Sequence, residues 1–183
     1  MRTRKAPFGR PADNYARRGM GFEGLLNDMH DLYKAMGRGW TVKQYLPMVI
    51  VSHDGRGNLA KVIGRATVDY IACVSGRFIA FDAKDCTETR IPLDRLAGHQ
   101  LQDLIDIDRN GGIAFVLVRF EGRRCYRVPA LAWAAAEDAH KTGKATAYNG
   151  WTPTGKASIS ENELPHEWAI CDVDWIDKVF LHR

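Results

Sequence analysis

The chain has 183 residues, of which 45% are hydrophobic, which is sufficient for one domain that buries roughly 70% of the surface its unfolded chain exposes. Its four cysteines lack the close spacing of a zinc site and the density of a secreted disulfide scaffold, so we expect reduced cysteines in a cytoplasmic protein. The net charge is only +4, and no stretch approaches the ~20 apolar residues that span a bilayer, which argues against a membrane protein.

The first 18 residues carry most of the positive charge. They contain six Lys or Arg residues against one aspartate, whereas residues 19–183 contain 20 basic and 21 acidic residues. Such an arm can follow a phosphate backbone by releasing counterions, but a solvated tail has the same composition, and both interpretations are open. We therefore expect a flexible basic arm over 1–18 and a single domain over 19–183.

Hydrophobic periodicity predicts the first elements of the domain. Apolar residues at three- and four-residue intervals predict a helix over 21–36. Residues 40–51 are β-prone, and the polar, glycine-containing stretch 52–58 predicts a turn or a protruding loop. Residues 66–86 contain two β-rich runs on either side of Ser75-Gly76, which predicts a tight hairpin.

The second half of the chain adds a crossover. Helical spacing over 93–109 ends at Asn110-Gly111-Gly112, and the continuous apolar run 113–120 predicts a strand buried on both faces. A strand, a helix and a buried strand in this order make a crossover unit. Pro129 opens an alanine-rich helix, the polar residues 141–166 are loop-like, and the C-terminal segment fits a strand or a helix. We therefore predict the α/β class, with a mixed sheet flanked by helices.

The hairpin at Ser75-Gly76 places polar side chains together. With a two-residue turn, Asp69 faces Asp82 across the strands, and Thr67 faces Lys84. Because side chains alternate along a strand, all four lie on one face. Two carboxylates with Cβ atoms ~5 Å apart repel each other unless a cation lies between them.

This arrangement suits metal-assisted hydrolysis of a phosphodiester. The carboxylate oxygens of Asp69 and Asp82 are ligands that Mg²⁺ prefers, with Mn²⁺ as a substitute, and the Lys84 ammonium stabilises charge that develops on the phosphate. The alternative is solvated charge on an exposed strand face, which is the commoner origin of an isolated Asp-x-Lys motif. The chain has no His-x-x-x-His or cysteine cluster that would favour zinc.

A series of motifs in order extends beyond this hairpin. The motifs are RRGMGFEGLLN from Arg17, TVDY from Thr67, GRFIAFDAK from Gly76, IPLDRLAGHQ from Ile91 and GGIAFVLVRF from Gly111. Together they resemble the RecU family of Holliday junction resolvases, in the PD-(D/E)xK nuclease superfamily, from about Arg17 to the C-terminus. The resemblance implies a restriction-endonuclease-like fold and a four-way DNA junction as substrate. It also implies a homodimer, because symmetric nicking of two strands needs two active sites.

The resemblance further implies roles for single residues. The expected metal ligands are Thr67, Asp69, Asp82 and Gln100. Lys84 is expected to stabilise the transition state, and Glu23, which matches the acidic residue of the family's N-terminal helix motif, is expected near the same site as a further catalytic residue. From the residues alone, Glu23 fits a solvated position on an amphipathic helix equally well, and Gln100 is better explained as part of a polar helix face, so only the resemblance makes Gln100 a ligand.

Two features depart from the family pattern. Asp82 stands where the family usually has glutamate, which is one methylene longer. The segment between Pro47 and Asp69 is several residues shorter than in typical members, where it forms a stalk that inserts into the open centre of the junction. We therefore expect a short projecting stalk over 51–65, with an ordinary basic hairpin tip as the alternative. The expected DNA contacts are Arg56, Lys61 and Arg65 of this stalk and Arg17 and Arg18 of the arm.

The leading hypothesis is a magnesium-dependent, structure-selective endodeoxyribonuclease that resolves Holliday junctions. Its expected partners are four-way junction DNA, a second copy of the chain and recombination proteins. A restriction-like or phage nuclease acting on branched or duplex DNA would use the same chemistry. A third hypothesis is a DNA-binding recombination accessory protein with a decayed nuclease site, which the presence of Asp69, Asp82 and Lys84 argues against.

Overall fold

The structure is a computed structural model that describes residues 21–54, 57–65, 67–171 and 173–178. The helices are α1 (Phe22–Ala35), α2 (Gly98–Arg109) and α3 (Ala130–Thr142). The strands are β1 (Trp40–Lys43), β2 (Met48–Asp54), β3 (Gly57–Val62), β4 (Tyr70–Val74), β5 (Arg77–Cys86), β6 (Arg90–Pro92), β7 (Ile113–Phe120), β8 (Arg124–Pro129), β9 (Ser158–Ser160) and β10 (Ala169–Ile170). Short 3₁₀ turns are η2 (Leu93–Arg95), η3 (Glu161–Glu163), η4 (His166–Trp168) and η5 (Ile176–Lys178). Within these ranges, no helix combines the length and the apolar character needed to cross a membrane.

Six strands form the central sheet in the order β1-β4-β5-β7-β8-β10. β5 and β7 are parallel, and the other neighbouring pairs are antiparallel. α2 connects the two parallel strands, so the predicted crossover is confirmed. Every residue of β7 is buried, as its continuous apolar sequence predicts. The predicted α/β class with a mixed sheet flanked by helices is therefore confirmed.

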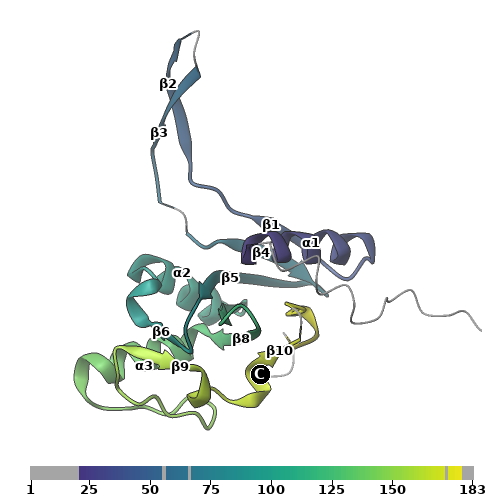
Figure 1. The fold of residues 1–183 in the computed structure, drawn as a ribbon. Coiled ribbons are helices and arrows are strands. Elements are labelled where there is room, and N and C mark those ends of the chain that lie inside the picture. Colours follow the sequence, from purple (N-terminus) through teal and green to yellow (C-terminus); the bar gives the residue numbers. More distant parts are fainter. Residues whose placement is uncertain (1–20, 55–56, 66, 172, 179–183) are drawn as a thin grey trace, which may run out of the picture.

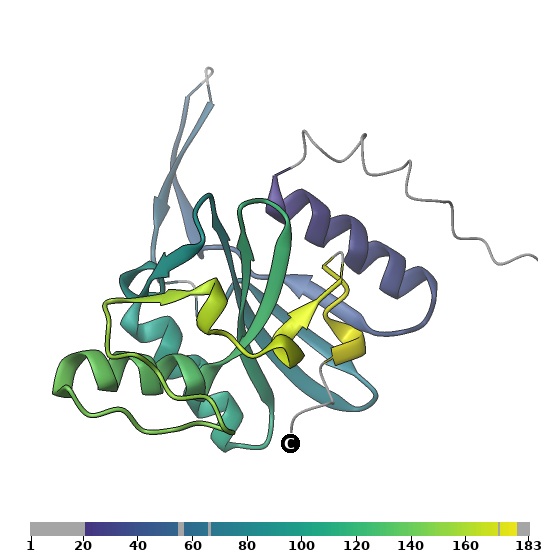
Figure 2. The same ribbon diagram turned by 60° about the horizontal axis from the view of Figure 1, so that its bottom comes forward.

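Helices cover both faces of the sheet (Figure 2). On one face, Leu26 and Tyr33 of α1 pack with Phe81, Phe115 and Trp175. On the other face, side chains of α2 and α3 pack against alternate residues of the same strands, and the shared cluster includes Ala80, Leu104, Val116, Val118 and Trp133. Because successive residues of β5 point to opposite faces, Phe81 lies on the α1 side and Asp82 on the side of α2 and α3.

β2 and β3 form a separate two-stranded hairpin that projects away from the domain (Figure 1). The hairpin begins earlier than the predicted stalk, because Met48 already pairs with Val62, and the Ile63 N–H donates to the Pro47 carbonyl at 2.9 Å. Residues 52–54 are strand, so much of the stretch predicted as a turn or loop is paired backbone. The polar composition of this stretch suggested a loop. A hairpin that extends into solvent, however, can pair its backbone without an apolar face.

Two further boundaries differ from prediction. The helix expected over 93–109 begins only at Gly98, because Leu96 and Ala97 have extended backbones after the 3₁₀ turn η2. Leu93 and Leu96 are buried nevertheless, so their spacing reflects core packing and not a helical turn. Within the polar segment 141–166, β9 pairs with β6, and the undecided C-terminal segment contains the short strand β10 followed by η5.

Candidate active site

The β4–β5 hairpin has the predicted turn and register. Ser75 and Gly76 have positive φ angles of 51° and 75°, which are typical of the two-residue type I′ turn that suits the twist of a hairpin. The pairing runs from Val74–Arg77 to Tyr70–Phe81. It stops there, because β4 begins only at Tyr70. The predicted strand pairing of Thr67 with Lys84 is therefore wrong.

Asp69 lies just beyond the end of β4 and still reaches across to β5. Its Oδ2 accepts a hydrogen bond from the Ala83 N–H at 3.0 Å. Its backbone carbonyl accepts a second hydrogen bond from the Gln44 N–H at 2.7 Å. These two contacts hold the Asp69 carboxyl group beside Asp82, close enough for its charge to act on Asp82.

Asp82 is completely buried. The Lys84 Nζ lies 2.9 Å from its Oδ2, and the Lys84 side chain is only 14% exposed. This contact is an ion pair without the alignment of a hydrogen bond, since neither oxygen of Asp82 has a well-formed hydrogen-bond partner among the described residues. A buried carboxylate with unmet acceptor capacity is rare in folded proteins and needs an explanation.

The surroundings of Asp82 favour its protonated form when no cation is bound. Burial, above all, and the neighbouring Asp69 carboxyl group raise the pKa of Asp82 to about 8, and Lys84 offsets only part of this effect. A divalent cation between the two carboxyl groups would favour the ionised form of Asp82 instead. Among the described residues, no third carboxylate, histidine or cysteine completes a metal-binding group with them.

Asp82 and Lys84 lie on β5, one of the two parallel strands. Asp82 pairs with Val116 and Lys84 with Val118, and both strands end soon afterwards, at Cys86 and Phe120. In open α/β sheets, ligands bind outside the carboxyl ends of such strands. The sheet topology therefore places Lys84 near an edge that a substrate can reach.

Glu23 lies beside this site, together with a lysine that the sequence did not indicate. The exposed Glu23 of α1 forms an ion pair with Lys43 of β1. Lys43 pairs with Tyr70, the residue after Asp69, and Glu23 and Asp69 both raise the pKa of Lys43. Lys43 thus adds a positive charge near Asp69, on the α1 side of the sheet. An alternating strand pattern gives no sign of it, because only the fold brings α1 and β1 together.

Thr67 and Gln100 are not joined to the acidic pair by contacts comparable to those of Asp69. The exposed Thr67 lines a hollow with Ile71, Phe78 and Asp103. The Oε1 of Gln100 accepts a hydrogen bond from the Ala97 N–H at 3.3 Å and so caps the start of α2. This contact is the helix-capping role that the residue type also suggests.

The expected DNA contacts are only partly described. Lys61 in β3 and Arg65 after it are exposed, at the projecting hairpin and its base (Figure 1). Arg17, Arg18 and Arg56 lie outside the described residues.

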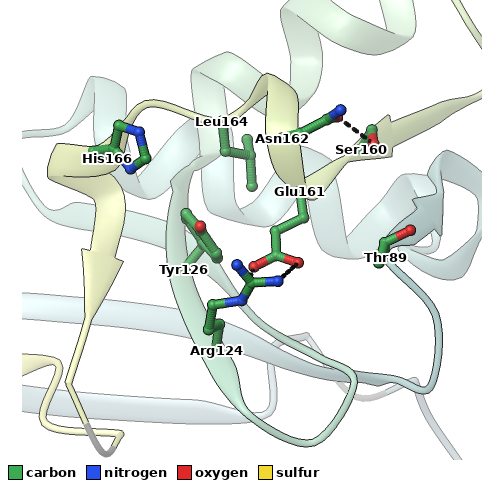
Figure 3. A pocket seen from close by; sticks show the side chains of 8 residues that line it. All are labelled: Thr89, Arg124, Tyr126, Ser160, Glu161, Asn162, Leu164 and His166. Carbon is green, nitrogen blue, oxygen red and sulfur yellow. Dashed lines mark hydrogen bonds and ion pairs between the residues drawn. The ribbon is translucent and has the colours of Figure 1, made fainter.

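A second polar site, which the sequence did not indicate, lies on the Lys84 side of the sheet. Lys84, Val118 and Tyr126 are abreast on three neighbouring strands and therefore share one face. Beside Tyr126, Arg124 Nε lies 2.6 Å from Glu161 Oε1, and its Nη2 donates to Oε2 at 2.9 Å (Figure 3). Burial and the charge of Glu161 raise the pKa of Tyr126. This pair joins η3 to the start of β8 and forms the wall of a hollow that His166 also lines.

The fold and site together define a class. Lys84 and the buried Asp82 lie on one of two parallel strands, the half-buried Asp69 lies beside them, and a hairpin projects from the domain. This arrangement is suited to metal-dependent hydrolysis of nucleic acids. The chain belongs to the RecU family, whose model, described as Recombination protein U, matches residues 17–163.

The similar proteins found by comparison are named as Holliday junction resolvases. The chain is 33% identical to the Holliday junction resolvase RecU of Streptococcus pneumoniae (strain Hungary19A-6) over 126 residues, and 35% identical to that of Geobacillus kaustophilus over 118 residues. These matches cover 64% and 61% of this chain, and 64% and 59% of the relatives, so the chain spans less than two thirds of either relative. The solved structure of Hjc, a Holliday junction resolvase from Archaeoglobus fulgidus, has a TM-score of 0.42 and 13% identity over 83% of this chain and 94% of its own.

Proposed function

We propose that this chain is a magnesium-dependent endodeoxyribonuclease that resolves four-way DNA junctions by symmetric nicking. The observation that carries the proposal is the buried Asp82, which lies against Asp69 and Lys84 and has no well-formed hydrogen-bond partner among the described residues. Membership of the RecU family supports the same reaction, since the relatives reported above are named for resolving Holliday junctions.

The donor atoms fit a divalent metal ion. Two carboxyl groups side by side, one of them buried, favour a shared cation, and hard oxygen donors suit Mg²⁺, with Mn²⁺ as a substitute. Asp69 and Asp82 are the proposed charged ligands, and Thr67 and Gln100 the proposed sources of neutral oxygens. When bound, such an ion polarises the phosphate and makes a bound water easier to deprotonate.

The basic residues act on the phosphate. Lys84 is held close to Asp82 and largely shielded from water, so its charge acts strongly on a phosphate that enters the site. Lys43 and Glu23 form the outer side of the site. We assign Lys43 to binding the phosphate backbone next to the scissile bond, and Glu23 to holding Lys43 in place and supplying negative charge near the metal.

The projecting hairpin is the proposed element of substrate selection. Its length and its distance from the core suit entry into the open centre of a junction, where phosphates of four strands lie close together (Figure 1). Arg56, Lys61 and Arg65 are the proposed contacts there, and Arg17 and Arg18 extend the contact along the duplex arms. Recognition then depends on shape and charge and not on base contacts.

A homodimer is proposed because the base of the hairpin exposes apolar side chains. Tyr45 is 77% exposed and Ile63 61%. Further apolar residues that are at least 44% exposed in the same region are Leu46, Met48, Val49, Ile50, Val51 and Val62. So many exposed apolar side chains in one region indicate an interaction site. A second copy would cover it and supply the second active site that symmetric nicking needs. Recombination proteins are further proposed partners, in the cytoplasm, where four free cysteines stay reduced.

A junction cleavage assay tests the proposal. We expect cleavage of a mobile four-way junction into symmetric nicked products with Mg²⁺, none with EDTA, and little cleavage of a linear duplex of the same sequence. Asp82→Asn should abolish cleavage, and Asp94→Asn, at an exposed acidic residue of η2, should not. Equal cleavage of both substrates would favour the restriction-like or phage nuclease, and junction binding without cleavage would favour the accessory protein.

A further inference from the structure

The ion pair of Arg124 with Glu161 is unusual because only one of its partners is buried. The Glu161 side chain is 5% exposed, whereas that of Arg124 is 63% exposed. Both carboxylate oxygens meet the guanidinium edge, with Nε 2.6 Å from Oε1 and Nη2 donating to Oε2 at 2.9 Å. Burying a carboxylate costs free energy, and an exposed partner offsets only part of this cost. The pair therefore fixes the plane of the guanidinium more than it stabilises the fold.

The exposed guanidinium borders a hollow. Arg124 lines a hollow of about 400 Å³ together with Tyr126, Leu164 and His166. Tyr126 and Leu164 are buried and His166 is exposed, so the hollow has apolar groups at depth and polar groups at its rim. These three side chains lie to one side of the Arg124–Glu161 pair (Figure 3). Volumes of about 300–1,000 Å³ are typical of small-molecule sites, so the hollow can take one planar ring system.

The hollow lies within reach of a DNA strand at the proposed nuclease site. Lys84 and Tyr126 both pair with Val118, from opposite sides, so they share a face of the sheet. Strands lie about 4.8 Å apart, which places Lys84 and Tyr126 about 10 Å apart along the sheet. Arg124 is two residues from Tyr126 and on the same face. Because a strand of duplex DNA rises about 3.4 Å per nucleotide, about three nucleotides span this distance.

We propose that the hollow binds one base of the DNA strand next to the scissile phosphate, stacked on the guanidinium of Arg124. This inference rests on the proposed nuclease function and adds the element that positions the strand at the site. An unpaired base stacks well on an arginine plane. In the open form of a four-way junction, the central base pairs lack a stacking neighbour on one side, which lowers the cost of releasing a base.

The charges around Arg124 favour a base over a phosphate. Glu161 contacts the guanidinium edge, and Glu121 lies 3.9 Å from Nη2. These two carboxylates already compensate the positive charge of Arg124, so a phosphate would gain little there and would be repelled by both. A base carries no charge and needs only the open face of the guanidinium. Arg124 is thus the contact with DNA, and Glu161 is a positioning residue.

A scan with abasic residues tests the contact without DNA cleavage. Each junction carries one abasic residue, placed in turn at the nucleotides on either side of the bond that the wild type cleaves in Mg²⁺. The affinity of the full chain for each junction is then measured in Ca²⁺. We expect one position at which loss of the base weakens wild-type binding roughly tenfold, as for the loss of one stacked base.

Arg124→Lys identifies the residue that holds this base. Lysine keeps a positive charge beside Glu161, so the fold is retained, but it has no planar face. The variant should bind the intact junction roughly tenfold more weakly than the wild type, and the abasic residue at the sensitive position should cause no further loss. Arg123→Lys, at the neighbouring exposed arginine that does not line the hollow, should keep the wild-type pattern. Glu161→Gln should reduce the sensitivity to that abasic residue, and unchanged sensitivity would overturn the positioning role.

Salt dependence separates a base contact from a phosphate contact. Arg124→Gln should leave the log–log salt slope of junction binding unchanged, whereas a slope lowered by about 0.9 would indicate a phosphate and overturn the base assignment. Equal abasic sensitivity of wild type and Arg124→Lys, or no sensitive position in the wild type, would overturn the hollow as a base site. Mg²⁺-dependent cleavage of the intact junction would then still support the proposed function. If the wild type neither binds nor cleaves the junction, the proposed function fails and this inference fails with it.

Discussion

Asp82 and Lys61 lie in strands of one chain, but different forces hold them in place. Asp82 is in a strand paired on both sides and covered on both faces, and its side chain is fully buried. Lys61 is in a two-stranded sheet outside the domain, where most apolar side chains at the base are exposed. Packing against many neighbours fixes the position of Asp82. The position of Lys61 depends on one ladder of backbone hydrogen bonds.

This difference separates chemistry from substrate selection. A two-stranded hairpin is marginally stable by itself, so the projecting hairpin can change shape or sequence at little cost to the core. At its base, Gly64 lies so close to Pro47 that a Cβ atom there would be 2.7 Å from the proline ring, which limits change to the part beyond. Substitutions in the two regions should therefore affect different measurements.

The largest effect is expected at Asp82. Asp82→Asn keeps the shape of the side chain but removes the charge that a metal ion needs, so junction cleavage in Mg²⁺ should fall by at least about 10²–10³-fold, a loss typical of removing one charge-stabilising group. Junction binding, measured in Ca²⁺ or EDTA, should change less than about threefold, because binding depends mainly on phosphate contacts. Cleavage at the wild-type rate would remove Asp82 from the site.

Asp82 should also make the stability of the metal-free protein depend on pH. Its pKa is raised to about 8, against about 3.9 in an unfolded chain, so folding favours the protonated form. The stabilisation from this group is complete below about pH 4 and is lost as the pH rises through about 8. Asp82→Asn should therefore be more stable than the wild type at pH 9, by about 1–4 kcal/mol. Each kcal/mol corresponds to about 2–4 °C in Tm for a chain of this length.

The wild-type and variant melting curves should be compared in EDTA between pH 5 and pH 9. Burial lowers the pKa of His30 to about 4, so both proteins lose stability as the pH falls below about 6.5, and this loss cancels in their difference. The difference should be smallest at pH 5 and should reverse when Mg²⁺ is added at pH 8. A difference that is constant with pH would mean that Asp82 stays ionised with protein partners alone.

Much of this site is accessible from sequence because it follows from local rules. Ser75-Gly76 specifies a two-residue turn, and the turn fixes the register that brings Asp69 towards Asp82. The continuous apolar run of β7 predicts the buried neighbour of β5. The first prediction rests on the residues of a turn and the second on an unbroken apolar run, and both signals are local in the sequence.

The rest depends on contacts that no local pattern contains. The complete burial of Asp82 was not predicted, because the cover on that side comes from segments distant in sequence. The ion pair of Glu23 with Lys43 requires α1 to lie beside β1. No local sequence pattern distinguishes Arg127 from an exposed arginine in a strand. Only the assembled sheet shows that it is buried.

The hairpin should give a smaller effect, confined to binding. Changing Arg56, Lys61 and Arg65 together to alanine should lower junction affinity roughly tenfold and reduce the log–log salt slope by about 0.9 per lost phosphate contact. Duplex affinity and the melting temperature should change little, because the hairpin lies outside the core. The control variant carries alanine at three exposed basic positions elsewhere, Lys34, Arg109 and Lys144. An equal loss for junction and duplex would remove the hairpin from substrate selection.

The smallest effect is expected at Glu23 and Lys43, which lie between these two regions. Glu23 is 67% exposed, and an exposed ion pair contributes about 0–1 kcal/mol, so Lys43→Met and Glu23→Gln should each leave the melting temperature nearly unchanged. If Lys43 binds the phosphate next to the scissile bond and Glu23 holds Lys43, each variant should slow cleavage, by roughly tenfold or less. The double variant should then be little slower than Lys43→Met, since residues of one unit are not additive. Single-turnover rates of all four proteins on the same junction give the coupling directly. Fully additive losses would show that Glu23 acts on the site without Lys43, and unchanged rates would leave the pair as a surface contact between α1 and β1.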